Sequence, residues 1–297
     1  MTRPVAYRPR AWPAVVLLAL ALAVPAGCTR RDGPTPAPPA TGSAAPTGAT
    51  TTGPAPPTPG TTGPAPPTRP VTPTQPARPT ALPAALRGVD VTRIPTSRRV
   101  VALTFDAGAN ADAVPSILAT LGRERVTATF FLTGDFVTAF PAPARSVVAA
   151  GHRLGNHSVS HPHLPALPVA QQRAQVLGAE RSLREVTGSD PRPLFRFPYG
   201  DRDAATIATV NGLGYVAVRW TVDSLGWQGL ASQTAAKVTE RVLATAQPGQ
   251  IVLMHVGSHP QDRSTLDADA LPGVIAGLRR QGYGFVTLDT LLQPAGG

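Results

Sequence analysis

"RRVVALTFDAGAN", residues 98–110, indicates how this chain folds. Its centre, from Val100 to Phe105, is an apolar run without alternation, which is typical of a parallel strand covered on both faces of its sheet. The run ends on a single acid, Asp106, which is followed by Ala107 and other small residues. An acid at the end of a buried strand usually takes part in chemistry. The stretch therefore predicts both a strand and one edge of a site.

Six further apolar runs resemble the first, and amphipathic segments separate them. Strands are expected at 98–105, 125–133, 152–156, 193–197, 215–220, 250–256 and 284–288. Helices are expected at 113–121, 143–150, 169–186, 204–213, 232–245 and 271–280. Such alternation predicts a single α/β domain over residues 86–297. A distorted, incomplete (β/α)7 barrel would place its site at the carboxyl ends of the strands.

The first 28 residues have the features of an export signal. Arginines precede an apolar run from Ala14 to Val24, which is too short to span a bilayer as a helix. The following VPAGC resembles a bacterial lipobox, with Pro25 where Leu is usual, and it would place a lipid on Cys28. We expect an exported protein, lipid-anchored to the outer face of the cytoplasmic membrane. Plain secretion and an uncleaved anchor are the alternatives.

Residues 29–85 are rich in Pro, Thr, Ala and Gly and contain TTGPAPPT twice. Such a segment has little to bury, so we expect a disordered, partly extended spacer. Residues 1–85 carry +6 of the chain's net charge of +10, because residues 86–297 hold 20 basic and 16 acidic side chains. No dense basic stripe remains, so nucleic acid is not an expected partner. Cys28 is the one cysteine, which excludes an internal disulfide and a two-thiol redox enzyme.

Two histidines follow the third strand in NHSVSHPHL. His157 and His161 are four residues apart, which on a helical turn puts both on one face, where they can share a metal. Their place after a buried strand, across the sheet from Asp106, favours a metal site over a loop with surface histidines. The other histidines, at 152, 163 and 259, are expected to be structural or surface residues.

Further polar residues end the later strands. Arg196 ends the fourth strand, and a buried arginine needs an acid, for which Asp106 is the natural partner. His255 ends the sixth strand, where we expect a proton donor whose tautomer is set by an acid such as Asp223. A structural ion pair and a core histidine are the corresponding alternatives.

Together, the motifs TFDAG, HSVSH, RFPYG, DSLGW and LMH occur in the order and spacing of a known family. Residues 98–290 resemble polysaccharide deacetylases with the NodB homology domain, carbohydrate esterase family 4. The family fold is a distorted, incomplete (β/α) barrel. The resemblance implies metal-assisted removal of N- or O-acetyl groups from sugars.

The resemblance also implies catalytic roles for individual residues. Asp106 would be the general base toward a metal-activated water, with Arg196 orienting it. His157 and His161 would be ligands of a divalent metal, with Zn expected and Co, Ni or Mn acceptable to the same donors. His255 would protonate the leaving group.

Substrate contacts follow from the same resemblance. Pro198 and Tyr199 would contact the substrate, with the backbone N–H of Tyr199 holding the oxyanion. Trp227 and Leu253 would wall the pocket for the acetyl methyl group. The hydroxyl of Ser158 would brace the histidine loop.

Two departures from the family pattern affect the expected site. The family usually has TFDDG, whose second acid is the third metal ligand, but this chain has Ala107. Asp106, Asn110 or Asp112 would then complete the metal shell, water would fill it, or the site would bind no metal. The second departure is Gly226, where the family often has an acid directly before Trp. Asp223 is left as the candidate partner of Arg196 or His255.

An exported deacetylase of peptidoglycan or another N-acetylated glycan is the function expected from these observations. Chitin oligomers and acetylated xylan are substrates of the same chemistry. A catalytically degenerate barrel that only binds glycan is the alternative that Ala107 favours. A glycosidase would need two facing carboxylates and would leave the histidines unexplained.

Overall fold

The computed structural model describes residues 82–293. The expected signal peptide, Cys28 and the linker as far as residue 81 lie outside the described residues. The described part begins with a 3-10 turn, Ala84–Leu86, whose Leu86 is buried against the sheet. Among residues 82–293, none of the helices combines the length and apolar character needed to cross a bilayer.

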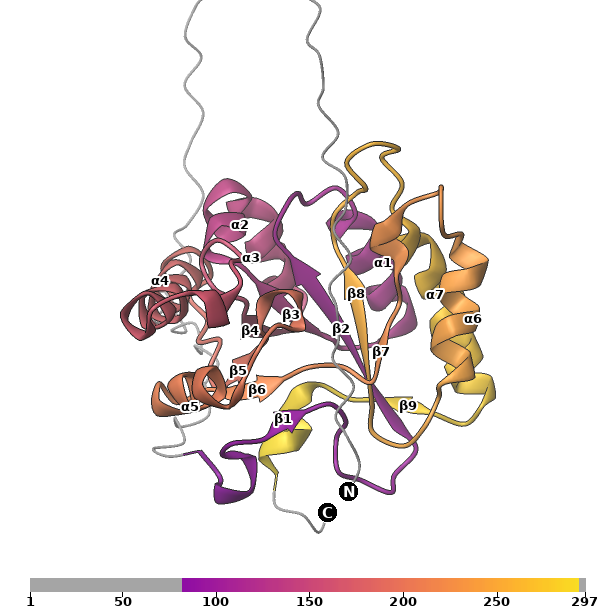
Figure 1. Cartoon of the computed structure of the whole chain (residues 1–297). Coiled ribbons are helices and arrows are strands. Elements are labelled where there is room, and N and C mark those ends of the chain that lie inside the picture. The colour runs from indigo at the N-terminus through magenta and orange to yellow at the C-terminus, as the bar shows by residue number, and fades with distance from the viewer. Residues whose placement is uncertain (1–81, 294–297) are drawn as a thin grey trace, which may run out of the picture. The chain divides into compact units, whose positions relative to one another are not determined.

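A single sheet of nine strands, all paired in parallel, forms the centre of the described domain (Figure 1). Its order is β1-β6-β5-β4-β3-β2-β8-β7, and β9 pairs with the beginning of β2. The two end strands β1 and β7 are not paired with each other, so the barrel stays open. The strands are β1 Asp90–Val91, β2 Val100–Ala107, β3 Thr129–Leu132, β4 Arg153–Asn156, β5 Leu194–Phe195, β6 Val216–Val218, β7 Val222–Asp223, β8 Gln250–His255 and β9 Gly284–Phe285.

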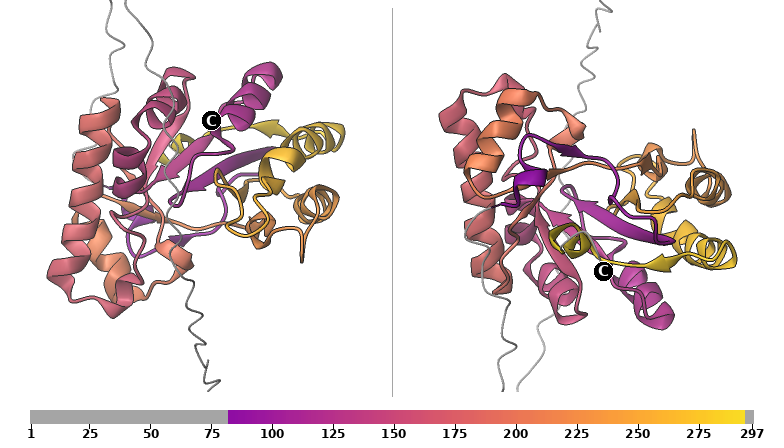
Figure 2. Two further views of the ribbon diagram at one scale, coloured as in Figure 1. Left: turned by 90° about the horizontal axis from the view of Figure 1, so that it is seen from above. Right: turned by 90° about the horizontal axis from the view of Figure 1, so that it is seen from below.

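Helices surround this sheet on the outside (Figure 2). In Figure 1, α2 to α5 lie to the left of β2, whereas α1, α6 and α7 lie to its right. The helices are α1 Val114–Glu124, α2 Gly134–Ala139, α3 Pro141–Ala149, α4 Val169–Thr187, α5 Ala204–Gly212, α6 Ala235–Ala244 and α7 Leu266–Arg280. Helices outside a curled parallel sheet confirm the predicted incomplete α/β barrel.

All seven predicted strands are present, but three short elements were missed. The strands β1 and β7 have two residues each, and α2 has six, which is too short for a periodic pattern to show. Helix α7 begins at Leu266, five residues before the predicted start, and contains Pro272. Its first turn carries Asp267 and Asp269, and acids there stabilise a helix N-terminus.

Strand alternation assigns each side chain of β2 to one face of the sheet. Val101, Leu103 and Phe105 pack in an apolar cluster shared with α1 and α7, on the outer face. Ala102 packs in a second cluster, on the inner face, which contains no residue of the α-helices. Because side chains alternate along a strand, Asp106 lies on the inner face, at its carboxyl end. The same alternation in β8 puts Ile251 and His255 on that face.

Gly155 in β4 makes room for an aromatic ring on the inner face. A Cβ at this position would lie 2.4 Å from two ring carbons of Phe131, a ring that is fully buried. The face of this ring makes a cation–π contact with Arg196, whose guanidinium lies 4.1 Å from the ring centroid. The missing side chain at 155 therefore helps to position Arg196.

We expect Gly155→Ala to destabilise the domain by about 1–3 kcal/mol, because the new Cβ would force the fully buried Phe131 ring to shift. Gly122→Ala is the matched control. Its Cβ would meet no atom within 4 Å, and it lies within α1, so it should stabilise by about 0.5–1 kcal/mol. Urea denaturation followed by circular dichroism measures both changes. Equal effects of the two substitutions would contradict the packing argument.

Candidate active site

A buried ion pair between Asp106 and Arg196 lies at the carboxyl ends of β2 and β5. The Arg196 side chain has no exposed surface, and its Nη1 donates to Asp106 Oδ1 at 2.7 Å. Its Nη2 donates to the carbonyl of Arg219 at 2.9 Å. Burial alone would raise the pKa of Asp106, but its charged neighbours, with the Arg196 guanidinium first among them, together outweigh burial and hold that pKa below its usual range. Asp106 is therefore a carboxylate, as the predicted pairing required.

His157 is held with one ring nitrogen toward this carboxylate. Its Nδ1 lies 2.8 Å from the carbonyl oxygen of Arg196, which only accepts hydrogen bonds, so Nδ1 carries the proton. Burial lowers the pKa of His157, which leaves the ring neutral and gives Nε2 a lone pair. That Nε2 lies 3.4 Å from Asp106 Oδ2. Two electron-rich atoms thus face each other, an arrangement that a cation between them would stabilise.

His161 reaches the site from an irregular loop, so the expectation of a helical turn at 157–161 was wrong. Ser158 and His161 both have left-handed backbones, with φ of 68° and 58°. The Ser158 hydroxyl accepts from the His161 amide at 3.1 Å, which supports the loop. The His157 and His161 rings nevertheless meet edge to face, with centroids 4.7 Å apart. Burial lowers the pKa of His161 to about 4, so it too is neutral at neutral pH.

The histidine loop is anchored from behind by a buried amide. Asn156 Oδ1 accepts from the Ser158 amide at 2.9 Å. Asn156 Nδ2 donates to the carbonyl of Val176 in α4 at 2.8 Å and to the Tyr215 hydroxyl at 3.1 Å. Asn156 was not among the predicted site residues, although it directly precedes His157. Its contacts fix the backbone from which both histidines project.

The third metal ligand remains absent from the described residues. No group of three or more His, Cys, Asp or Glu side chains within residues 82–293 is arranged to hold a metal. Ala107 packs in the outer apolar cluster. Asn110 Oδ1 accepts from the Ser258 amide at 2.8 Å, and Asp112 Oδ2 accepts from the Ser258 hydroxyl at 2.5 Å. Asn110 and Asp112 therefore tie the β2 and β8 loops together and are not placed as ligands.

His255 is the neighbour of Asp106 across the β2–β8 pair, because the two residues are in register. Among residues 82–293, no hydrogen bond or ion pair joins His255 to Asp223, the candidate partner, although the charge of Asp223 acts on both His255 and Arg196. Asp267, in the first turn of α7, is the acid in contact with His255: its Oδ2 lies 3.4 Å from Nδ1. Strand-end reasoning missed Asp267 because it belongs to a helix. Two closely spaced acids, Asp267 and Asp269, were the available signal for a helix start.

Asp223 instead organises the loop that follows β7. Its Oδ1 accepts from the Leu225 amide at 2.9 Å, and its Oδ2 accepts from Trp227 Nε1 at 3.3 Å. Trp227 is 51% exposed, as an aromatic side chain that meets a ligand must be. Leu253, the predicted companion of Trp227, is buried and pairs in register with Asp223. Both residues therefore lie on the β7–β8 side of the site.

Tyr199 stands at the opposite side, in the 3-10 turn Pro198–Gly200 after β5. It is 61% exposed and has a left-handed backbone, with φ of 58°. Its ring meets His161 edge to face and stacks on His163, whose Nδ1 lies 2.8 Å from Asp201. Of the other two histidines left out of the predicted site, His152 is buried beside Phe130 and His259 lies 3.2 Å from Asp262.

Backbone strain gathers in the loops around these residues. Ser158, His161, Tyr199 and Leu225 all have positive φ without being glycine, and each lies in a loop after a carboxyl strand end. Such conformations cost of order 1–3 kcal/mol each and persist only where surrounding contacts fix them. The loops therefore hold these four side chains in fixed positions.

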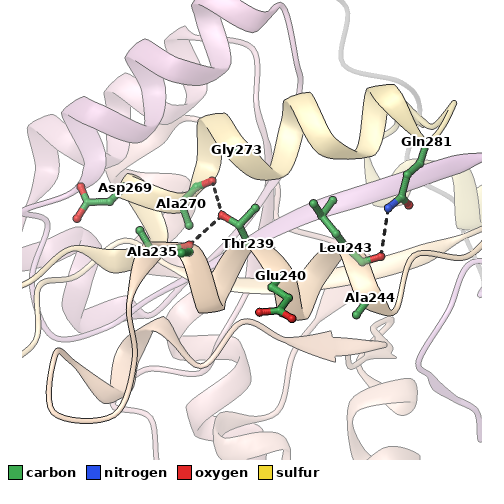
Figure 3. A pocket seen from close by; sticks show the side chains of 10 residues that line it. Ala235, Thr239, Glu240, Leu243, Ala244, Asp269, Ala270, Gly273 and Gln281 are labelled. Atoms are coloured by element: carbon green, nitrogen blue, oxygen red, sulfur yellow. Dashed lines mark hydrogen bonds between the residues drawn. The ribbon is translucent and has the colours of Figure 1, made fainter.

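A surface hollow of about 630 Å³ lies elsewhere, between α6 and α7 (Figure 3). Small and polar side chains line it, among them Thr239, Gly273 and Asp269. None of the residues that contact Asp106 or His255 takes part in it.

Residues 93–218 match the sequence profile of the family described as polysaccharide deacetylase. The chain is 34% identical to the peptidoglycan-N-acetylglucosamine deacetylase of Bacillus cereus, over 67% of this chain and 70% of the relative. It is 37% identical to a chitooligosaccharide deacetylase of Bradyrhizobium, over 62% and 87% of the two chains. Among solved structures, a carbohydrate esterase family 4 pseudoenzyme from Bacillus anthracis superposes with a TM-score of 0.64, at 29% identity over 70% of each chain.

We expect Arg196→Met to destabilise the protein by about 3–5 kcal/mol, because it leaves the buried Asp106 carboxylate unpaired. Adding Asp106→Asn should recover part of that loss, so the double variant costs less than the sum of its single changes. Arg123→Met, which breaks an exposed pair with Glu124, should change stability by at most about 1 kcal/mol. Denaturation at pH 7 in the presence of a chelator measures the stability of Arg196→Met, Asp106→Asn, their combination and Arg123→Met. Strictly additive losses in the double variant would contradict the pairing of Asp106 with Arg196.

Proposed function

The chain belongs to the polysaccharide deacetylase family, carbohydrate esterase family 4, and on that premise we propose that it removes acetyl groups from an N-acetylated cell-wall glycan. The named relatives act on peptidoglycan or chitooligosaccharide, both of which carry N-acetylated sugars. Peptidoglycan is the substrate that the N-terminal sequence favours. O-acetyl groups are the other targets of the same chemistry.

The observation that carries this proposal is the pairing of Asp106 with His255. A carboxylate kept ionised by Arg196 lies in register with a histidine on the adjacent strand. Burial alone would lower the pKa of His255, but contact with Asp267 and the charges of Asp106 and Asp223 together outweigh burial and raise that pKa, so the imidazolium is favoured. A base and an acid with pKa values moved apart are what acyl hydrolysis requires of two neighbouring groups.

Each oxygen of Asp106 has a separate task in this proposal. Oδ1 is bound to Arg196, which fixes the carboxylate plane. Oδ2 faces His157 and accepts the proton of the attacking water. His255 then donates its proton to the nitrogen or oxygen of the leaving sugar. Tyr199 and Pro198 stand on one side of the reacting acetyl group, with Trp227 and Leu253 on the other.

We further propose that His157 and His161 hold a divalent cation, with Zn²⁺ as the first candidate and Co²⁺, Ni²⁺ or Mn²⁺ also suited. When bound, the cation supplies Lewis acidity toward the acetyl carbonyl and a more acidic water. The support for this is the His157 ring, whose Nδ1–H is bound to a backbone carbonyl, as in most metal-bound histidines. With Ala107 in place of an acid, water would complete the shell, and we expect weak affinity.

Export is a separate proposal, and it rests on the N-terminal sequence. Basic residues, a short apolar run and the VPAGC segment would direct the chain across the membrane, and a lipid on Cys28 would keep it there. The Pro- and Thr-rich residues 29–85 would then hold the domain at a distance, within the cell wall.

A glycan-binding barrel without catalysis is the second candidate. Two observations favour it, namely Ala107 at the ligand position and the similarity to a family 4 pseudoenzyme. Against it, Asp106, Arg196 and His255 form a connected charged set, which glycan binding alone does not require.

Acetate release from N-acetylated glycan oligomers by the whole chain tests the enzyme proposal, with and without added metal. We expect metal-stimulated release, reduced roughly 10²- to 10⁴-fold in kcat by Asp106→Asn, because the base is lost. Release that is absent under every metal, together with retained glycan binding, would establish the binding barrel instead.

Metal binding has its own measurement, independent of activity. Isothermal titration of Zn²⁺ into chelator-stripped protein should show one site whose affinity falls by about 100-fold or more in His157→Ala, because half of the protein ligands are removed. His259→Ala, which changes a histidine outside the site, is the control and should bind like the unaltered chain. Equal affinity in both variants would place the metal elsewhere.

A further inference from the structure

Gly226 is directly before Trp227, and the space of its side chain is already taken. A Cβ at this position would lie 2.4 Å from Asp267 Oδ1 and 2.7 Å from Asp267 Cγ. The backbone does not require glycine here, because Gly226 is not in the left-handed region. Occupied space, rather than backbone conformation, is therefore what excludes a side chain at position 226.

The occupant, Asp267, is a buried carboxylate with an unusual set of contacts. It is 4% exposed, and its Oδ2 accepts from the His255 amide at 2.8 Å while lying 3.4 Å from His255 Nδ1. Its Oδ1 and the His255 Nδ1 have no hydrogen-bond partner among the described residues. An under-bonded buried acid beside an under-bonded imidazole is costly unless the pair serves a purpose.

We propose that Asp267, supplied by α7, is the positioning residue of His255, and that position 226 is bare because its side-chain space receives this carboxylate. The inference rests on the proposed function, in which His255 is the acid. It assigns the acid–histidine contact to the α7 helix, whereas the sequence pattern pointed to the loop before Trp227. The two positions compete for one volume beside the same imidazole.

Other charges face His255 and stay unchanged in the test. Asp106 on β2 and Asp223 on β7 both favour the imidazolium, although less than Asp267 does. His157 and His161 are the further titratable groups on the same side. Removing Asp267 alone therefore isolates its contribution to the protonation of His255.

The decisive variants move the carboxylate from position 267 to position 226. Asp267→Asn keeps the size of the side chain, and we expect kcat to fall roughly 10- to 100-fold with KM changed less than about twofold. Asp267→Ala should lower kcat by at least the same factor. Adding Gly226→Asp to Asp267→Ala should restore kcat to within about tenfold of the unaltered chain, because the new side chain enters the vacated volume.

Two controls separate the carboxylate from packing. Gly226→Ala combined with Asp267→Ala fills the same volume without a charge and should stay as inactive as Asp267→Ala. Asp269→Ala removes the other acid of the first turn of α7, which lines the outer hollow (Figure 3) and has no contact with His255, so kcat should not change.

A second readout does not depend on turnover. The ¹⁵N signals of His255, assigned by their loss in His255→Gln, are titrated in each metal-free variant. We expect the His255 midpoint to move to lower pH in Asp267→Asn and to return in Gly226→Asp/Asp267→Ala. If the unaltered chain releases no acetate, the proposed function fails, and the titration still decides the role of Asp267.

The inference is overturned by either of two results. An unchanged His255 midpoint and kcat in Asp267→Asn would show that the acid does not act on the imidazole. Equal rescue by Gly226→Ala and Gly226→Asp in the Asp267→Ala background would show that the volume beside His255 must be filled but need not be charged.

Discussion

A guanidinium with no exposed surface is the constraint on which the described domain depends. Arg196 cannot remain buried unless a carboxylate and carbonyl groups compensate its charge, and Asp106 and Arg219 provide these groups. The aromatic face of Phe131 lies beneath it, in space left by Gly155. The carbonyl of Arg196 in turn fixes the tautomer of His157. One buried cation thus links β2, β3 and the ends of β5 and β6, and it fixes the ionisation of Asp106 and the tautomer of His157.

The surrounding loops show a second, related principle. Each loop at the carboxyl edge is held by side chains that bind backbone groups, as Asn156 holds the Ser158 amide and Asn110 holds the Ser258 amide. Such contacts compensate for the positive φ of Ser158 and its neighbours. The positions of the loop residues are therefore fixed by neighbouring amide side chains. The sheet itself determines the face on which Asp106 and His255 lie.

The sequence predicts the sheet well because its strands are apolar runs that differ clearly from their surroundings. It also predicts the Asp106–Arg196 pair, since a buried arginine has few acceptable partners. It does not predict β1 and β7, whose two residues carry no period, or the loop conformation at Ser158 and His161, because spacing alone does not distinguish a helical turn from a strained loop. Asp267 was missed for a different reason: its contact with His255 depends on how α7 packs, which no local pattern encodes.

The crowding between Gly226 and Asp267 also restricts how such a site can change over generations. A chain carrying acids at both positions would force a Cβ to within 2.4 Å of a carboxylate oxygen, whereas a chain carrying neither would leave His255 without this neighbour. Single substitutions starting from either arrangement lead to one of these two unfavourable chains. Moving the acid from α7 to the position before Trp227 therefore takes two substitutions, and either of them made alone gives an unfavourable chain.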